Sequence, residues 1–331
     1  MSDLFELLDS SPDILISDAF VITNNKIKNY DKIVCAISGG SDSDIMLDMC
    51  TKLDPEKKIR YVWFNTGLEY QATKDHLDYL EKKYGIKIER IKAKKPIPLS
   101  CREYGQPFLS KQVSEFIYRL QRHNFKWEDK PYEELLEEYP KCKASLKWWC
   151  NRWGNKKNGT NSKFNISYYK YLKEFMVSNP PDYFISPKCC YFAKKKIVSD
   201  YIRDNNIDLS LSGVQKSEGG ARASAYKNCF TSKDNGADEY RPIFWYLNET
   251  KRKYEEAYNV THSDCYCVYG LDRTGCAGCP FGKYFEYELE VIEKYEPKLY
   301  KAVNNIFGKS YEYTRAYYRY REECKAREGT L

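Results

Sequence analysis

The feature that most constrains the fold is an apolar run followed by a glycine-rich turn and a helical pattern. Residues 32–37, KIVCAI, have the β-branched composition of a buried strand, and SGGSDS then leads into DIMLDMCTKL. The rhythm repeats with a strand over 60–64, a helix over 71–85 and a strand over 87–91. Strands that alternate with helices predict an α/β fold with a doubly wound, mainly parallel sheet and helices on both faces. Ligands of such sheets bind at the carboxyl ends of the strands.

Changes in composition divide the chain into five predicted segments. The segments are an N-terminal helical segment (1–31), a nucleotide-binding core (32–99), a basic aromatic helical insertion (100–187), the rest of the core with a Cys-Cys pair and a Cys-x-x-Cys (188–285), and a C-terminal helical extension (286–331). The second half of the core contains the helical pattern AKKKIVSDYIRDNN and the strand IDLSLSG, which ends at Gly213.

The chain contains thirteen cysteines, and whether they form disulfides depends on the compartment in which the protein is found. The amino terminus carries acids instead of a basic region, and no apolar run approaches the roughly 20 residues that cross a bilayer. We therefore expect a cytoplasmic protein without a membrane partner. In a reducing compartment, clustered cysteines indicate metal ligands or redox thiols before disulfides.

Positive charge is concentrated in one part of the chain, although the net charge is only +7. Residues 141–173 contain nine basic side chains and no acid, interleaved with Trp and Tyr residues. This pattern suits a groove that follows a phosphate backbone and stacks bases. The simpler interpretation, a solvated basic face over a small aromatic core, is the one that composition alone favours.

The glycine turn has the composition of an anion site. Gly39 and Gly40 let the backbone turn tightly after the strand, so that successive N–H groups and the start of the next helix point at one spot. Ser38 and Ser43 add hydroxyl donors, and Asp42 is placed to hold Mg²⁺ on bound phosphates. The spacing differs from the loop of kinases and GTPases.

In this context, SGGSDS resembles the PP-loop of the ATP pyrophosphatase superfamily, which has an adenine nucleotide alpha hydrolase-like fold. Ser41 stands where many relatives have lysine. Further motifs resemble the phosphoadenosine phosphosulfate (PAPS) reductase family over about 32–285. They are FNTGLEY, the stretch from SPKCCYFAKKK to GVQKSEGGAR, YRPIFWYLNETKRKYEE and GLDRTGCAGCP. The resemblance implies an adenine nucleotide, either ATP or one of the adenylyl sulfate type, as ligand.

The resemblance also implies roles for individual residues. Nucleotide contacts would come from the loop itself, the turn after the second strand and four later positions. These residues are Ser38, Gly39, Gly40, Ser41, Asp42, Ser43, Asn65, Thr66, Gly67, Gly213, Lys216, Glu218 and Arg273. Arg222 joins Asp42 as a candidate catalytic residue, because a guanidinium pairs with oxyanions in a bidentate manner.

Four cysteines are the candidate metal ligands. Cys276 and Cys279 can offer two thiolates from one turn, and family members that hold a [4Fe–4S] cluster pair such a motif with a distant Cys-Cys. That resemblance implies Cys189 and Cys190 as the other ligands. Structural zinc on the same thiols and buried thiols without metal stay open as alternatives. Cys265 and Cys267 form a further Cys-x-Cys pair that could instead ligate a metal with Cys276 and Cys279, an alternative that would leave Cys189 and Cys190 without a role. The three histidines, His76, His123 and His262, form no pair at ligand spacing.

Three functions fit these motifs. In the first, an enzyme activates a substrate, such as a nucleic acid bound through 141–173, by cleaving ATP between the α and β phosphates. It then transfers sulfur, as tRNA thiolation enzymes and DndC-type proteins do, with a cysteine desulfurase as a partner. The second is a sulfonucleotide reductase that uses Cys324 as nucleophile and thioredoxin as partner, although Cys324 lacks the family's surrounding residues. The third is a nucleotide-binding module without turnover.

Overall fold

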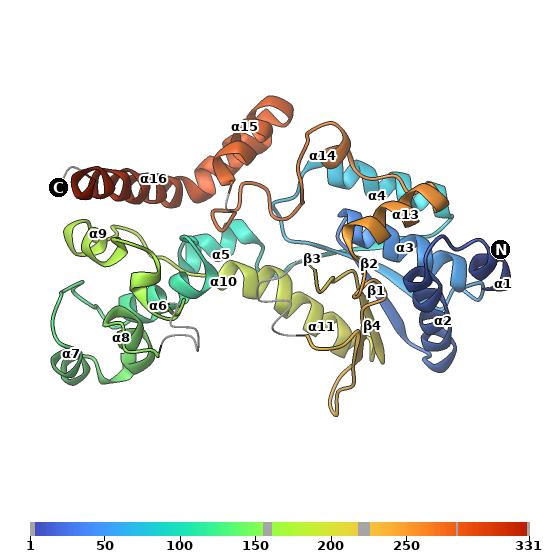
Figure 1. Ribbon diagram of the computed structural model, residues 1–331, viewed down its shortest axis with the longest axis horizontal. Coiled ribbons are helices and arrows are strands. Elements are labelled where there is room, and N and C mark those ends of the chain that lie inside the picture. The colour runs from blue at the N-terminus through green and yellow to red at the C-terminus, as the bar shows by residue number, and fades with distance from the viewer. Residues whose placement is uncertain (1–3, 155–160, 218–225, 283, 330–331) are drawn as a thin grey trace. The chain divides into compact units, whose positions relative to one another are not determined.

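The chain forms two compact units in a computed structural model that describes residues 4–154, 161–217, 226–282 and 284–329 (Figure 1). The first unit comprises Met1–Lys94 and Lys194–Cys276, and the second comprises Lys95–Ala193 and Ala277–Leu331. The insertion at 100–187 and the extension at 286–331, as delimited from the sequence, both lie in the second unit.

A six-stranded sheet forms the centre of the first unit. Its strands are β1 (Ile33–Ile37), β2 (Ile59–Asn65), β3 (Ile88–Lys92), β4 (Leu209–Ser212), β5 (Phe230–Thr231) and β6 (Asp238–Tyr240). The strand order is β3-β2-β1-β4-β6-β5, and every pair is parallel except β5 with β6. The predicted fold class is therefore confirmed. Because the chain leaves β1 in one direction toward β2 and returns on its other side as β4, the sheet has its topological switch point between β1 and β4.

Helices pack on both faces of this sheet. They are α1 (Leu4–Asp9), α2 (Ile14–Asn29), α3 (Ser41–Leu53), α4 (Gln71–Tyr84), α11 (Ile197–Asp204), α13 (Asn248–Tyr258) and α14 (Asp264–Cys267). Figure 1 shows α2, α3 and α4 on one side of the strands and α11 on the other. Side chains alternate accordingly: Ile33 and Cys35 join the core under α2 and α3, whereas Val34 packs with Tyr201 of α11.

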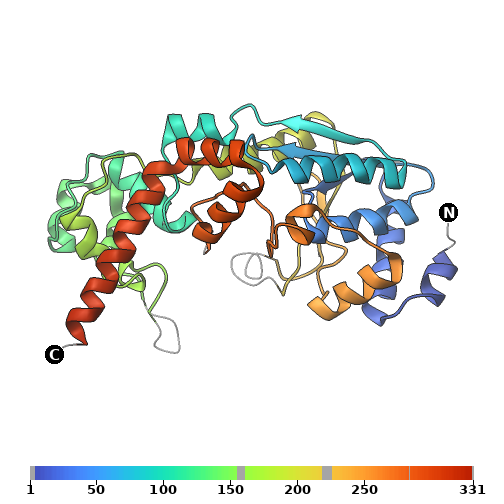
Figure 2. The same cartoon turned by 90° about the horizontal axis from the view of Figure 1, so that it is seen from above.

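The second unit is helical in its described part. Its helices are α5 (Ile97–Tyr104), α6 (Lys111–Gln121), α7 (Tyr132–Glu138), α8 (Lys143–Trp149), α9 (Leu172–Ser178), α10 (Lys188–Cys190), α15 (Phe285–Tyr295) and α16 (Pro297–Glu328). The last is the long red helix in Figure 2. Local signals explain the helix ends: Ser110 caps α6 by accepting from the Val113 N–H, and Pro297 opens α16, where its missing N–H costs nothing.

The basic aromatic stretch 141–173 contributes to the core of the second unit. Trp148 and Trp149 are fully buried and pack with Phe116 and Phe125, so these two indoles form an aromatic core and are not presented to solvent. Phe164 and Tyr168 of the same stretch are exposed, and residues 155–160 lie outside the described part. The small aromatic core expected from composition is therefore present.

The helices can also be checked for membrane-spanning length and hydrophobicity. Among the residues that the structure describes, no helix is both long and apolar enough to cross a bilayer.

Candidate functional site

The glycine loop lies between β1 and α3, beside the switch point of the sheet. Gly39 adopts a left-handed conformation with φ of 71°, which lets the chain reverse direction directly after the strand. The Ser43 hydroxyl then fixes the loop: it donates to the Gly40 carbonyl at 2.8 Å and accepts from the N–H groups of Ser38 and Gly40. The buried Ser43 side chain therefore stabilises the loop from within, while Ser38 remains exposed.

Neighbouring atoms leave no room for a side chain at Gly39 in the loop or at Gly213 beside it. A Cβ on Gly213, which follows β4, would lie 2.9 Å from the Asp42 carbonyl oxygen. A Cβ on Gly39 would lie 2.6 Å from the Thr73 methyl group of α4. Two glycines predicted to bind nucleotide are thus required for the close packing of β4 and α4 against the loop.

Gly39→Ala is expected to lower the free energy of unfolding by about 1–3 kcal/mol, because it adds backbone strain and a collision with Thr73. Gly85→Ala is the matched control, since Gly85 also has positive φ but no atom within 4 Å of its added Cβ. Urea unfolding measures both. The double variant Gly39→Ala/Thr73→Ser removes the colliding methyl group and should recover part of the loss; equal losses in both single variants would contradict the steric explanation.

The turn after β2 provides a second set of polar groups. Gly67 has φ of 85°, and its N–H donates to the Asn65 side chain at 2.8 Å. The buried Thr66 donates its hydroxyl to Glu69 at 2.5 Å, and this hydroxyl lies 3.8 Å from the Cys276 sulfur. The predicted residues Asn65, Thr66 and Gly67 therefore form a compact turn at the carboxyl end of β2.

A segment near the end of the first unit covers the glycine loop. The Tyr266 hydroxyl of α14 accepts from the N–H groups of Ser41 and Thr274 at 3.3 and 3.2 Å. It also lies 3.1 Å from the position of a Cβ on Gly40. Residues 266–276 thus contact both the loop and the β2 turn, since Cys276 reaches Thr66.

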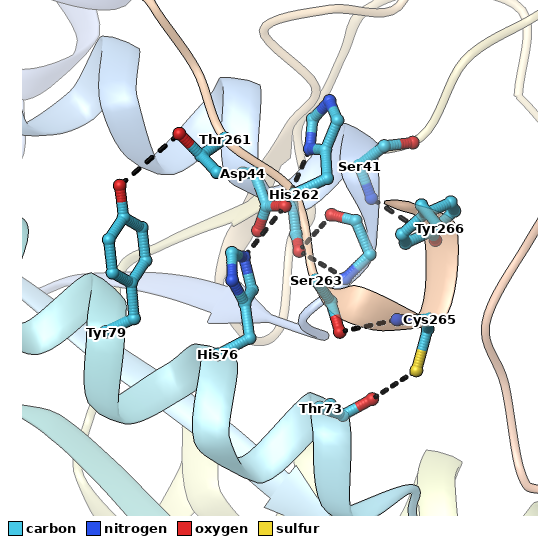
Figure 3. Close-up of polar contacts among 12 residues, drawn as sticks. Ser41, Asp44, Thr73, His76, Tyr79, Thr261, His262, Ser263, Cys265 and Tyr266 are labelled. Carbon is cyan, nitrogen blue, oxygen red and sulfur yellow. Dashed lines mark hydrogen bonds and ion pairs between the residues drawn. The ribbon is translucent and has the colours of Figure 1, made fainter. Parts of the chain in front are cut away.

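The two acids in the first turn of α3 have different surroundings. Asp44 is fully buried, and its Oδ2 lies 2.9 Å from His262 Nδ1 and 3.1 Å from His76 Nε2 (Figure 3). Asp42 is partly exposed and forms an ion pair with Lys251 of α13, at 2.5 Å from its Oδ1. Asp42 is therefore the carboxylate of this turn that a metal ion can reach from solvent. Although the two histidines form no pair at ligand spacing in the sequence, the fold brings both to Asp44.

His262 carries a shifted pKa. Burial disfavours its charged form, but hydrogen bonds to Asp44 and Glu255 outweigh burial and raise the pKa of His262 to about 9. The protonated His262 therefore stabilises the folded state fully below its ordinary pKa of about 6.5, and this stabilisation is lost as the pH rises through about 9.

His262→Gln should consequently lower the free energy of unfolding by about 1–3 kcal/mol at pH 6, with a smaller effect at pH 9.5. His123→Gln, at an exposed position, is the control. Urea titrations across this pH range measure the difference, and a loss that does not vary with pH would refute the role of the imidazolium.

Three of the four predicted thiol ligands lie in the second unit with a fourth cysteine. Hydrogen bonding to Cys101 of α5 and burial raise the pKa of the Cys189 thiol, and a bond with Cys190 lowers it; nearby Cys279 raises it further. Packing of α5 on α10 fixes this arrangement, with Tyr104 and Phe192 stacked at 4.8 Å. The sequence did not single out Cys101, because it stands alone in SCREYG.

The donor chemistry of these thiols fits a thiolate-bound metal. Cys276, the remaining predicted ligand, is the last residue of the first unit. Within the described ranges, no group of three or more His, Cys, Asp or Glu side chains has the arrangement of a metal site. The ligand assignment consequently stays a prediction.

Cys265 and Cys267 have separate surroundings. The buried Cys265 sulfur lies 3.7 Å from the Thr73 hydroxyl, whereas Cys267 is exposed and donates to the His262 carbonyl at 3.8 Å. Figure 3 shows Cys265 directed toward Thr73 on α4.

Lys216, Arg273 and Cys324 are the remaining predicted site residues in the described part of the chain. The Lys216 ammonium lies 4.6 Å from the centre of the Trp245 ring, and Arg273 is exposed. Cys324 contacts Tyr320 one turn earlier in α16. Glu218 and Arg222 lie outside the described residues.

A doubly wound sheet with a glycine loop at its switch point is the arrangement that the resemblance to PP-loop proteins implies. Residues 32–112 match the family model of the phosphoadenosine phosphosulfate reductase domain. The resemblance of the nucleotide-binding core to this family is thereby confirmed over those residues.

Part of the chain is also similar to a curated protein. An uncharacterised protein of Methanocaldococcus jannaschii is 33% identical over 117 residues, which are 34% of this chain and 22% of that protein. The chain thus spans about a fifth of the length of this curated relative.

Among solved structures, the PAPS reductase of Candida auris in its phosphate complex has 11% identity and a TM-score of 0.44, covering 83% of this chain and 96% of that one. The NH3-dependent NAD synthetase of Campylobacter jejuni has 13% identity and a TM-score of 0.37, covering 95% and 96%. The U34-tRNA thiolase NcsA of Methanococcus maripaludis, solved with its [4Fe–4S] cluster, has 12% identity and a TM-score of 0.37, covering 92% and 79%.

Proposed function

We propose that the chain is a PAPS reductase-like PP-loop enzyme of sulfur metabolism. It binds ATP or a related adenine nucleotide with Mg²⁺ and cleaves it between the α and β phosphates to activate an acceptor for sulfur transfer. The observation that carries this proposal is the glycine loop: Gly39 turns the chain, Ser43 holds it, and Asp42 stands at the start of α3 beside the loop N–H groups.

The loop residues would act on the leaving group. A nucleophile of the acceptor attacks the α-phosphorus, a new bond to phosphorus forms, and the bond to the bridging oxygen breaks. Pyrophosphate leaves with the electron pair. Backbone N–H groups at the amino end of α3 stabilise the negative charge of the leaving group. Asp42 would hold Mg²⁺, which neutralises phosphate charge and orients the nucleotide.

Cys189, Cys190, Cys276 and Cys279 would hold an iron–sulfur cluster or, in the alternative, zinc. A bound cluster would supply the chemistry for sulfur insertion into the activated acceptor. Phe164 and Tyr168 are exposed in the basic stretch 141–173, which supports a polynucleotide as the acceptor class, because exposed rings stack on bases.

Product analysis tests this function. Purified protein with Mg²⁺ and ATP should release pyrophosphate, and release should increase with nucleic acid. Release of sulfite from adenylyl sulfate with thioredoxin, abolished by Cys324→Ser, would instead identify a sulfonucleotide reductase. Nucleotide binding without either product would identify a binding module.

A further inference from the structure

The glycine loop lacks a cation of its own. Residues 38–43 contain two glycines, three serines and Asp42, so the only charged side chain in the loop is negative. Backbone N–H groups bind phosphate oxygens, but a pyrophosphate group with several negative charges is also stabilised by a nearby ammonium or guanidinium. Asp42 would otherwise repel such a ligand until Mg²⁺ binds.

The fold brings one lysine to this place from a distant part of the chain. The Lys251 ammonium of α13 lies 2.5 Å from Asp42 Oδ1 and donates to the Ser41 hydroxyl at 3.2 Å. The Lys251 side chain is only 16% exposed, so its stem is packed while its ammonium contacts the loop. All three residues belong to the first unit.

Position on the helix selects this lysine from three consecutive basic residues. Arg252 pairs with Glu256, and Lys253 pairs with Asp13 and Glu249. Because successive helical residues point about 100° apart, a shift of one or two positions directs the charge away from the loop.

We propose that Lys251 is the phosphate-binding cation of the glycine loop, supplied by α13 in place of a lysine within the loop. The inference rests on the proposed nucleotide site and names a ligand-binding residue for it. Without nucleotide, the ammonium neutralises Asp42. With nucleotide and Mg²⁺, rotation about the last bonds of the lysine side chain turns the ammonium from Asp42 to the adjacent phosphates, and the Asp42 carboxylate then binds the metal ion.

Calorimetric titration with inorganic pyrophosphate and with Mg²⁺-ATP tests the role of Lys251. Lys251→Ala should weaken binding of both ligands about 10- to 100-fold, as expected for loss of a charged hydrogen bond to phosphate. Lys253→Ala is the matched control from the same helix and should bind like the wild type. The difference between Lys251→Ala and wild type should shrink as salt increases.

Restoring a positive charge from a second position tests whether the charge itself is what binds phosphate. Ser41 is partly exposed at the first position of α3, so Ser41→Lys in the Lys251→Ala background would return a positive charge to the loop and should restore most of the affinity. Affinity of Lys251→Ala within twofold of wild type, or equal losses in Lys251→Ala and Lys253→Ala, would overturn the proposal.

Separate outcomes distinguish the inference from the proposed function. Lysine-dependent binding of pyrophosphate without cleavage of ATP would refute the enzyme activity and keep the role of Lys251. Full ATP cleavage and binding in Lys251→Ala would support the enzyme activity and refute the role of Lys251. A wild-type chain that binds neither ligand would refute both.

Discussion

Asp42→Ala is expected to lower Mg²⁺-dependent nucleotide turnover at least about 100-fold, because it removes the carboxylate that would hold the metal ion on the phosphates. Asp44 cannot substitute for it, since its side chain is fully buried and occupied by two histidines. The variant should fold normally, because the Asp42 side chain is 22% exposed and Asp42 is not part of the apolar core of the described first unit. Pyrophosphate release over a range of Mg²⁺ concentrations measures the effect.

A control variant and a binding measurement separate the role of Asp42 from a general loss of activity. Asp18→Ala removes a carboxylate from an exposed position on α2 and should leave turnover unchanged. Binding of metal-free pyrophosphate to Asp42→Ala should be retained or strengthened, because a negative charge has left the loop. Unchanged turnover in Asp42→Ala would remove this residue from the site.

Cys189→Ser and Cys190→Ser are each expected to weaken metal binding about 100-fold or more, since serine does not replace a thiolate ligand of iron or zinc. Anaerobic purification followed by iron, zinc and acid-labile sulfide analysis measures the effect. Cys229→Ser, at a half-buried cysteine outside the predicted ligand set, should keep the metal content of the wild type.

The same measurement identifies the metal and its fourth ligand. Iron with an equal amount of sulfide supports the cluster, whereas zinc alone, or no metal in the wild type, contradicts it. Cys276→Ser and Cys101→Ser form a pair: loss of metal only in Cys276→Ser supports the predicted set, and loss only in Cys101→Ser assigns the fourth thiolate to α5.

Local patterns made much of the fold predictable. Strands β1 to β4 each overlap a strand that the sequence predicts, at 32–37, 60–64, 87–91 and IDLSLSG, and the glycine loop follows the first of them as expected. The short strands β5 and β6 were missed, because two or three residues are too few to show an alternating pattern. Trp148 and Trp149 look like stacking residues in composition, but their burial depends on the packing of several helices.

The parts of the site that the sequence did not reveal depend on long-range contacts. His76 and His262 lie in separate elements, and neither has a histidine at the short spacing that marks a ligand pair. Lys251 is the first of three consecutive basic residues on a charged helix, so the packing of α13 is what distinguishes it. Cys101 becomes notable only when α5 lies against α10.

The glycine contacts around the loop also define its tolerance to mutation. Positions 39 and 213 admit no side chain without collision, one with a buried methyl group and one with backbone. Ser41, by contrast, is partly exposed, and its hydroxyl accepts a hydrogen bond from the long side chain of Lys251. A saturation library of this region should therefore return glycine almost exclusively at 39 and 213, while position 41 accepts many residues and offers the place to retune ligand choice.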